Sequence, residues 1–219
     1  MNNDSDRSKI IHCLMPTSPE VVICPNLAHH CIVKDYFKLR KNIKTYTQNQ
    51  VEIIENAHEE LDVTRITISV VPLKGDYAHA KFIFRITIPE EYPNCAPAIR
   101  CETPIFHPNI AFRRKGDNVC LNLLTKWCKS YNLLTVVEGI LFLLDNPNYR
   151  DPNNFDCAIP LGQTAKHCVE RSLAGDTVNY VEYPRNQTWC EWRKSVINTT
   201  YSTAHVLPEA VEDINKPPL

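Results

Sequence analysis

The sequence predicts an α+β fold, in which helices cover one face of an antiparallel sheet. Three observations lead to this prediction. A helical pattern occupies residues 28–46, strand-like alternation follows between residues 64 and 101, and apolar helical segments return after residue 133. The stretch between the last strand and the later helices has no regular period. This order of elements is typical of a sheet with helices gathered on one side.

The first element is a helix between Ala28 and Tyr46. Apolar residues recur there at roughly helical spacing, with lysines and arginines between them. The pattern predicts an amphipathic helix with a basic outer face. Such a face is either a solvated surface or a partner-binding one, and the sequence leaves both open.

Three short runs that follow the helix read as strands. Residues 64–71 and 81–88 alternate large apolar residues with other types, and a shorter run covers residues 98–101. A period of two predicts strands with one buried face. Lys74-Gly75-Asp76 is expected to form the turn between the first two runs.

The later elements are predicted to be helical. Leu133–Leu144 forms a central apolar helix that is too short to span a bilayer. Residues 155–173 are also expected to be helical, with breaks at Pro160 and Gly162. A last short helix is predicted from about residue 186 to residue 196.

Composition restricts the class of protein. The chain has 219 residues, enough for one well-packed domain, and its formal net charge of −1 shows no bias toward nucleic acid. Residues 1–25 contain no sustained apolar run, so we predict no signal peptide. The ten cysteines include no C-x-x-C pair, so we predict no metal site and expect most of them to be small buried residues in an intracellular chain.

The segment from Cys101 to Asn122 carries the candidate chemistry. It is long and irregular, and such a segment inside a compact domain is usually functional. It contains His107-Pro108-Asn109 and, further on, Val119-Cys120-Leu121. A thiol nucleophile and an amide that can hydrogen-bond an oxyanion are what acyl transfer through a thioester requires. Cys120 and Asn109 are therefore the leading candidates.

From Ile32 to Tyr183 the chain resembles the ubiquitin-conjugating enzymes. The markers are short motifs in the family's order: Tyr92-Pro93 with Pro97, His107-Pro108-Asn109-Ile110, Val119-Cys120-Leu121, Trp127 and Asp151-Pro152. Within the family it is most similar to the neddylation branch, which conjugates the ubiquitin-like modifier NEDD. That similarity is carried by Cys101-Glu102-Thr103, by residues 118–124 and by residues 168–183.

The resemblance implies the arrangement of the secondary-structure elements and the residue limits of the domain. It implies an N-terminal helix, a four-stranded antiparallel meander, an irregular active-site loop, and central and C-terminal helices. We expect the ubiquitin-conjugating core domain to cover residues 28–198. A flexible N-terminal arm at 1–27 and a C-terminal tail at 199–219 are expected to flank it.

The resemblance also implies roles for individual residues. Cys120 would carry the modifier as a thioester, and Asn109 would stabilise the oxyanion, brace the loop, or do both. Asp151 would position and deprotonate the incoming lysine. His107 and Pro108 would fix the active-site turn, and a general-base role for His107 is disfavoured. The competing interpretations are a structural cysteine, a turn asparagine and an Asp-Pro turn.

The implied partners are a ubiquitin-like modifier, its heterodimeric activating enzyme, a RING-type ligase and a cullin substrate. The resemblance implies no metal and no cofactor bound by the chain, because the activating enzyme consumes the ATP. It also implies no nucleic acid and no membrane partner, and a location in the cytoplasm and nucleus.

The chain departs from the family pattern between His107 and Cys120, and three alternative functions were weighed. His107 and Cys120 lie thirteen positions apart, three more than is usual in the family, and the extra residues fall in 113–117. The alternatives are a carrier with the same chemistry for ubiquitin, a catalytically weak binding module on the same fold, and a cysteine protease. The protease is set aside because only His107 suggests a Cys-His pair.

Overall fold

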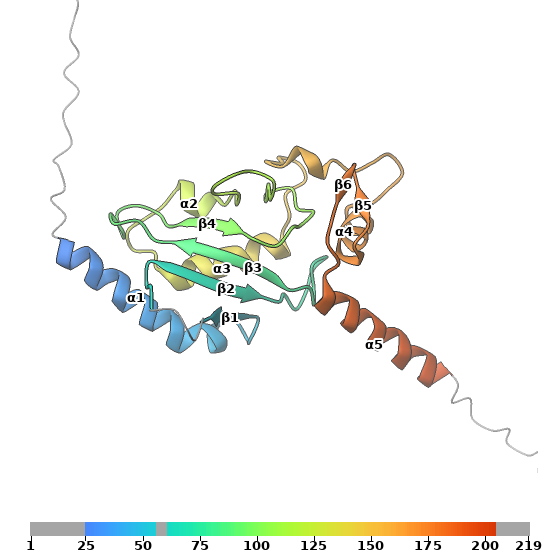
Figure 1. The fold of residues 1–219 in the computed structure, drawn as a ribbon, viewed down its shortest axis with the longest axis horizontal. Coiled ribbons are helices and arrows are strands. Elements are labelled where there is room, and N and C mark those ends of the chain that lie inside the picture. Colours follow the sequence, from blue (N-terminus) through green and yellow to red (C-terminus); the bar gives the residue numbers. More distant parts are fainter. Residues whose placement is uncertain (1–24, 56–60, 205–219) are drawn as a thin grey trace, which may run out of the picture.

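A four-stranded antiparallel sheet with sequential strand order forms the centre of the molecule (Figure 1). Its strands are β1 (Val51–Ile54), β2 (Arg65–Val70), β3 (Phe82–Thr87) and β4 (Ala98–Cys101). The computed structural model describes residues 25–55 and 61–204. The predicted α+β fold with a four-stranded meander is confirmed.

The period-two pattern of the sequence accounts for the two middle strands. Alternate residues of β2 and β3 point into the core, and Ile68, which faces Phe84 across the ladder, is fully buried with its partner. The alternation predicted β2, β3 and β4 to within a residue or two. It missed β1, where only Val51 is fully buried and Ile54 is 39% exposed.

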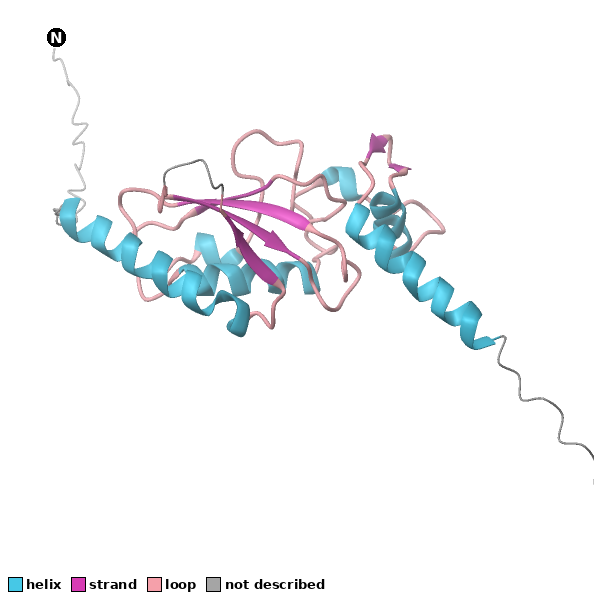
Figure 2. Cartoon of the chain, turned by 60° about the horizontal axis from the view of Figure 1, so that its bottom comes forward, coloured by secondary structure: helices cyan, strands magenta, loops and turns pink. Residues whose placement is uncertain are grey.

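Two helices cover one face of this sheet (Figure 2). These are α1 (Pro25–Tyr46), which contacts β1, and α3 (Leu133–Asp145), which contacts α1. Helix α3 is capped at its N-terminus by Asn132, whose side-chain oxygen accepts hydrogen bonds from the backbone of Leu134 and Thr135. That N-cap satisfies two donors that a helix start leaves unpaired, and the predicted central helix is confirmed.

The C-terminal part lies beyond one end of the sheet (Figure 1). It contains α4 (Ala165–Ala174), a small hairpin of β5 (Thr177–Val178) and β6 (Val181–Glu182), and α5 (Gln187–Ala204). Helix α4 ends at Gly175, which has a φ of +96°. A Cβ there would lie 3.1 Å from Cβ of Arg185, so the close approach of these segments favours glycine.

Several predicted boundaries were wrong. The breaks expected at Pro160 and Gly162 within 155–173 are confirmed, but the part before them is only the 3-10 turn η1 (Phe155–Cys157), and α4 begins at Ala165. The last helix continues to Ala204 rather than ending near residue 196. A short helix, α2 (Asn122–Thr125), and the β5–β6 hairpin were not predicted.

The limits of the domain stay predictions. Residues 25–27 of the predicted arm belong to α1, and residues 199–204 of the predicted tail belong to α5. The rest of the arm, 1–24, and of the tail, 205–219, lies outside the described residues.

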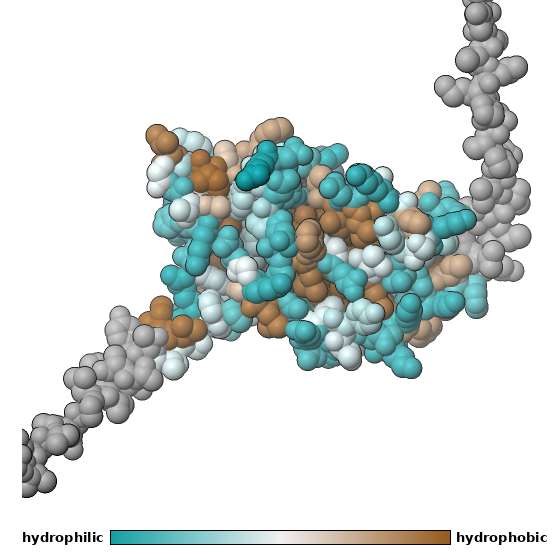
Figure 3. Space-filling view, turned by 180° about the vertical axis from the view of Figure 1, so that it is seen from behind, coloured by the Kyte–Doolittle hydropathy of each residue, from teal (hydrophilic) through white to brown (hydrophobic). Residues whose placement is uncertain are grey.

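Apolar side chains on one face of the molecule form several patches separated by hydrophilic ones (Figure 3). None of the helices in the described ranges is both long and apolar enough to span a bilayer. All eight cysteines in those ranges are free thiols. Half of these are buried, fewer than predicted: Cys101, Cys157, Cys168 and Cys190.

Candidate active site

The segment from His107 to Cys120 turns back on itself and places Asn109 beside Cys120. A bridge pairs Ile110 with Val119, and the backbone N–H of Cys120 donates to the carbonyl oxygen of Asn109 at 2.8 Å. The unusual spacing between His107 and Cys120 in the sequence did not determine whether Asn109 and Cys120 would lie together. Antiparallel pairing therefore brings together the two residues singled out for thioester chemistry.

Cys120 differs from the buried cysteines in its access to solvent. Cys120 is exposed. Burial, in contrast, raises the pKa of the Cys101 and Cys157 thiols to about 12 and keeps them protonated. A carrier thiol must meet a large partner and must react as the thiolate. Of the exposed cysteines among the described residues, Cys95 and Cys128 lie in other loops, and only Cys120 is paired with the His-Pro-Asn segment.

His107 anchors this segment to α3 from the inside. Its ring is fully buried, Nε2 lies 3.0 Å from the carbonyl oxygen of Leu143, and Nδ1 accepts the backbone N–H of Asn109 at 3.0 Å. Burial lowers its pKa to about 4, so the ring is neutral at neutral pH. Both ring nitrogens are used by backbone groups, which is the geometry of a turn anchor and not of a general base.

Asn109 links the segment from His107 to Cys120, the active segment, to the loop that follows α3. Its Oδ1 accepts the backbone N–H of Asn148 at 2.9 Å, and its Nδ2 donates to the carbonyl oxygen of Asp151 at 3.4 Å. The first bond orients the amide, because only the oxygen can accept. The amide nitrogen therefore faces the Asp151 backbone, and the exposed Asp151 residue lies on the loop that Asn109 braces.

Sequence reasoning missed Asn154, which holds the same segment from a second side. Its Nδ2 donates to the carbonyl oxygens of His107, at 3.2 Å, and Ile110, at 2.9 Å. Its own backbone N–H donates to the carbonyl oxygen of Pro108 at 2.8 Å. The available signal was the density of asparagine between residues 146 and 154, a residue type that often bonds backbone groups in turns.

Asn118 was also missed as a structural residue. It accepts the backbone N–H of Cys101 at 2.8 Å and donates to the carbonyl oxygen of the same residue at 2.9 Å. Its side chain thus continues the hydrogen bonding of edge strand β4. This tie fixes the residue two positions before Cys120 to the sheet.

The extra residues of the active segment lie in a turn outside the pairing of Asn109 with Cys120. The turn is closed where the backbone N–H of Ala111 donates to the carbonyl oxygen of Asn118 at 2.9 Å. Arg100 on β4 donates from Nη1 to the carbonyl oxygens of Arg114 and Gly116 and so ties the turn to the sheet. An insertion at such a turn changes little at its base.

The described residues contain no group of three or more His, Cys, Asp or Glu side chains placed to hold a metal ion. The side chains of the candidate site are a thiol (Cys120), an oriented amide (Asn109) and a carboxylate (Asp151). Such a set suits acyl transfer between a thioester and an amine.

Comparison with known proteins identifies the family. A family model described as ubiquitin-conjugating enzyme matches residues 38–172, more than half of the chain. The chain belongs to the ubiquitin-conjugating enzymes. It is therefore a transferase of ubiquitin-like conjugation, and the predicted family is confirmed.

The relatives of this conjugating enzyme include members of the neddylation branch. The probable NEDD8-conjugating enzyme Ubc12-like of Arabidopsis thaliana is 34% identical over 128 residues, which cover 57% of this chain and 68% of the relative. The NEDD8-conjugating enzyme UBC12 of Kluyveromyces lactis is 30% identical over 152 residues, 68% of this chain and 81% of the relative. The predicted similarity to this branch is confirmed.

A solved structure supports the fold of the conjugating enzyme as well. Ubc12 of S. cerevisiae superposes with a TM-score of 0.52 at 27% sequence identity. The match covers 67% of this chain and 85% of the yeast chain. The family range ends at residue 172, so α5 lies outside the region that the family model describes.

Proposed function

We propose that this chain carries NEDD8 as a thioester on Cys120 and transfers it to lysine side chains of substrate proteins. The observation that carries the proposal is the exposed thiol of Cys120, paired to a His-Pro-Asn segment in a chain whose relatives are named NEDD8-conjugating enzymes. The partners would be NEDD8, its heterodimeric activating enzyme, a RING-type ligase and a cullin substrate.

Loading is an exchange between two thiols. The Cys120 thiolate attacks the thioester carbonyl that joins the modifier to a cysteine of the activating enzyme. The carbon–sulfur bond to Cys120 forms, and the activating enzyme leaves as a thiolate that takes up a proton. The energy of one thioester is kept in the other, so we propose that the chain binds no cofactor and that ATP is consumed only by the activating enzyme.

Transfer to lysine would use Asn109 and Asp151. The lysine amine attacks the thioester carbonyl, a tetrahedral oxyanion forms, and the Cys120 thiolate leaves as the isopeptide bond is made. The amide nitrogen of Asn109 would donate to that oxyanion, because Asn109 is paired with Cys120 and its Nδ2 has a second N–H besides the one that bonds Asp151. The carboxylate of exposed Asp151 would orient the amine and accept its proton.

His107 and Pro108 would act by holding the site. The buried imidazole links the turn to α3, and the carbonyl of Pro108 accepts backbone hydrogen bonds from Asn153 and Asn154. We expect the enzyme to work in the cytoplasm and nucleus, where its thiols stay reduced.

A loading assay tests the proposal. The purified chain is mixed with ATP, the NEDD8-activating enzyme and NEDD8, and the products are separated on gels with and without reductant. We expect a reductant-sensitive adduct that is absent from Cys120→Ala. Cys128→Ala, which removes another exposed thiol, is the matched control and should load like the parent chain.

The same assay with ubiquitin and its activating enzyme decides the branch. An adduct only in the ubiquitin reaction would overturn the choice of NEDD8 and keep the carrier chemistry. No adduct with either modifier would overturn the carrier chemistry itself.

A further inference from the structure

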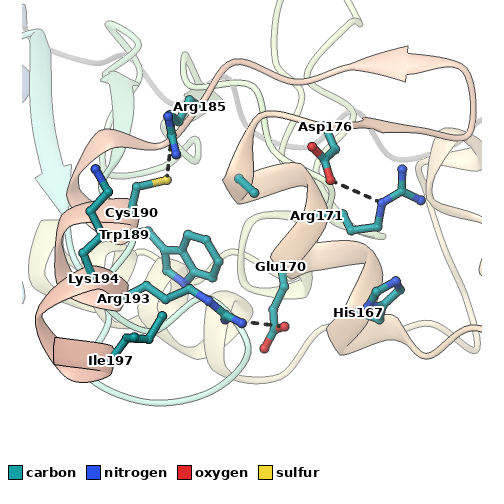
Figure 4. A pocket seen from close by; sticks show the side chains of 11 residues that line it. His167, Glu170, Arg171, Asp176, Arg185, Trp189, Cys190, Arg193, Lys194 and Ile197 are labelled. Carbon is teal, nitrogen blue, oxygen red and sulfur yellow. Dashed lines mark hydrogen bonds and ion pairs between the residues drawn. The ribbon is translucent and has the colours of Figure 1, made fainter. Parts of the chain in front are cut away.

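A groove of about 330 Å³ lies between α4 and α5 (Figure 4). None of its lining residues belongs to the segment 107–120 or to the loop 146–156. One wall comes from α5, which lies outside the matched family range. The groove is therefore separate from the thioester site and is built in part by the C-terminal helix of this chain.

The floor of the groove is apolar. Trp189 is only 5% exposed, Ala174 on α4 also lines the groove, and Ile197 on α5 is 45% exposed. The guanidinium of Arg193 lies 5.0 Å from the centre of the indole ring and reaches Glu170 on α4 at 3.6 Å. Figure 4 shows this pair crossing between the two helices. Because Arg193 covers the nearly buried indole, Ile197 is the apolar side chain that a ligand could contact.

The charges around this floor are mostly positive. The ion pair between Arg171 and Asp176, at 3.5 Å, adds to the one between Arg193 and Glu170. The two remaining cations, Arg185 and Lys194, are exposed and form no ion pair within the described part of the chain. The groove therefore presents two cations without a carboxylate partner.

One of these cations is held in place. Nε of Arg185 donates to the sulfur of Cys190 at 3.2 Å, and the Arg185 backbone is packed closely against Gly175. Its position at one end of the groove is therefore defined before a ligand arrives. A fixed guanidinium recognises a carboxylate better than a freely moving one, because less side-chain entropy is lost.

We propose that this groove binds an acidic peptide segment of a partner protein. An apolar side chain of the segment packs against the half-exposed Ile197, and its carboxylates pair with Arg185 and Lys194. The charge of the groove is complementary to such a segment. A nucleic acid fits poorly, because two cations without a carboxylate partner among the described residues are too few for the many phosphate contacts that nucleic-acid binding uses. The site goes beyond the proposed carrier function, since it would recruit a protein at a distance from Cys120.

Fluorescence anisotropy tests the proposal with the full chain and a labelled synthetic peptide, one leucine flanked by glutamates. The matched probe has glutamine in place of each glutamate. We expect saturable binding of the acidic probe only, weakened about tenfold or more by Lys194→Glu through loss of one charge pair and gain of repulsion. Lys166→Glu, on an exposed residue of α4 that does not line the groove, is the matched control and should bind like the parent chain.

A second variant tests the apolar contact. Ile197→Gln should weaken binding of the acidic probe, while thermal unfolding and loading of Cys120 stay unchanged in every variant. No saturable binding, equal binding of the two probes, or parent-like binding by Lys194→Glu would overturn the proposal.

The C-terminal segment of the chain is the alternative occupant of the groove, and the same assay distinguishes it from a partner protein. It carries Glu209, Glu212 and Asp213 among apolar residues. If neutralising these three acids in the full chain tightened binding of the acidic probe, the occupant would be this segment, and the assignment to a partner protein would be wrong.

Discussion

The sheet and the active segment are stabilised in different ways. In the sheet, backbone ladders and buried apolar side chains such as Ile68 and Phe84 define the structure. In the segment from His107 to Cys120, polar side chains bond backbone groups: His107, Asn109, Asn118 and Asn154. Burial of apolar area supplies most of the stability of a domain, whereas directional bonds determine the geometry of a site.

This difference separates two kinds of mutational effect. Loss of a sheet side chain should lower the free energy of unfolding and leave the chemistry of folded molecules unchanged. Loss of a polar brace should change the transfer rate of molecules that are still folded. The predictions that follow test this separation.

Phe84→Ala should have the largest effect on stability. Phe84 is fully buried at the centre of β3, so its truncation should cost about 3 to 5 kcal/mol of unfolding free energy, measured by urea titration. Phe37→Ala is the matched control, because Phe37 is 49% exposed on α1 and should cost far less. If the transfer rate per folded molecule fell in Phe84→Ala, the separation between sheet and site would be wrong.

His107 should make stability depend on pH. Its pKa is about 4 in the folded protein, against an ordinary value of 6.5, because burial disfavours the charged ring. The unfolded chain therefore binds a proton at a pH where the folded one does not. Stability is fully present above pH 6.5 and falls as the pH drops toward 4, by about 3 kcal/mol in total.

The measurement is unfolding free energy against pH for the parent chain and for His107→Gln. The difference between the two curves should change between pH 6.5 and pH 4, which separates His107 from the carboxyl groups that titrate in the same range. His167→Gln, an exposed histidine on α4, is the matched control. Parallel curves for the parent and His107→Gln would show that this ring is not the source.

The same contrast explains what the sequence could predict. Strands β2, β3 and β4 and helix α3 were predictable because each repeats its apolar residues with a clear period. Strand β1 is four residues long with little burial, so no period was visible. The part of α5 beyond residue 196 is rich in hydroxyl residues, and its helix continues in a sequence without strong apolar repetition.

The candidate active site was predictable in its residue types but not in the side chains that support them. Cys120 and Asn109 stand out from a motif, and antiparallel pairing then places them together. Asn118 and Asn154 bond carbonyls of residues 17 and 44 to 47 positions away, and those positions become neighbours only in the folded chain. A polar side chain that bonds a distant backbone group leaves no periodic signal in the sequence.

Asn109→Ala should have the smallest effect on folding relative to its effect on chemistry. Loss of an oxyanion donor typically lowers a rate by about 100-fold, which corresponds to about 2.7 kcal/mol in the transition state. The measurement is single-turnover discharge of the Cys120 thioester to free lysine, with loading followed in parallel. Asn122→Ala, an exposed asparagine beyond Cys120, is the matched control and should discharge like the parent. If Asn109→Ala lost stability and kept its discharge rate, Asn109 would be a loop brace alone, since its bonds to Asn148 and Asp151 are then its whole contribution.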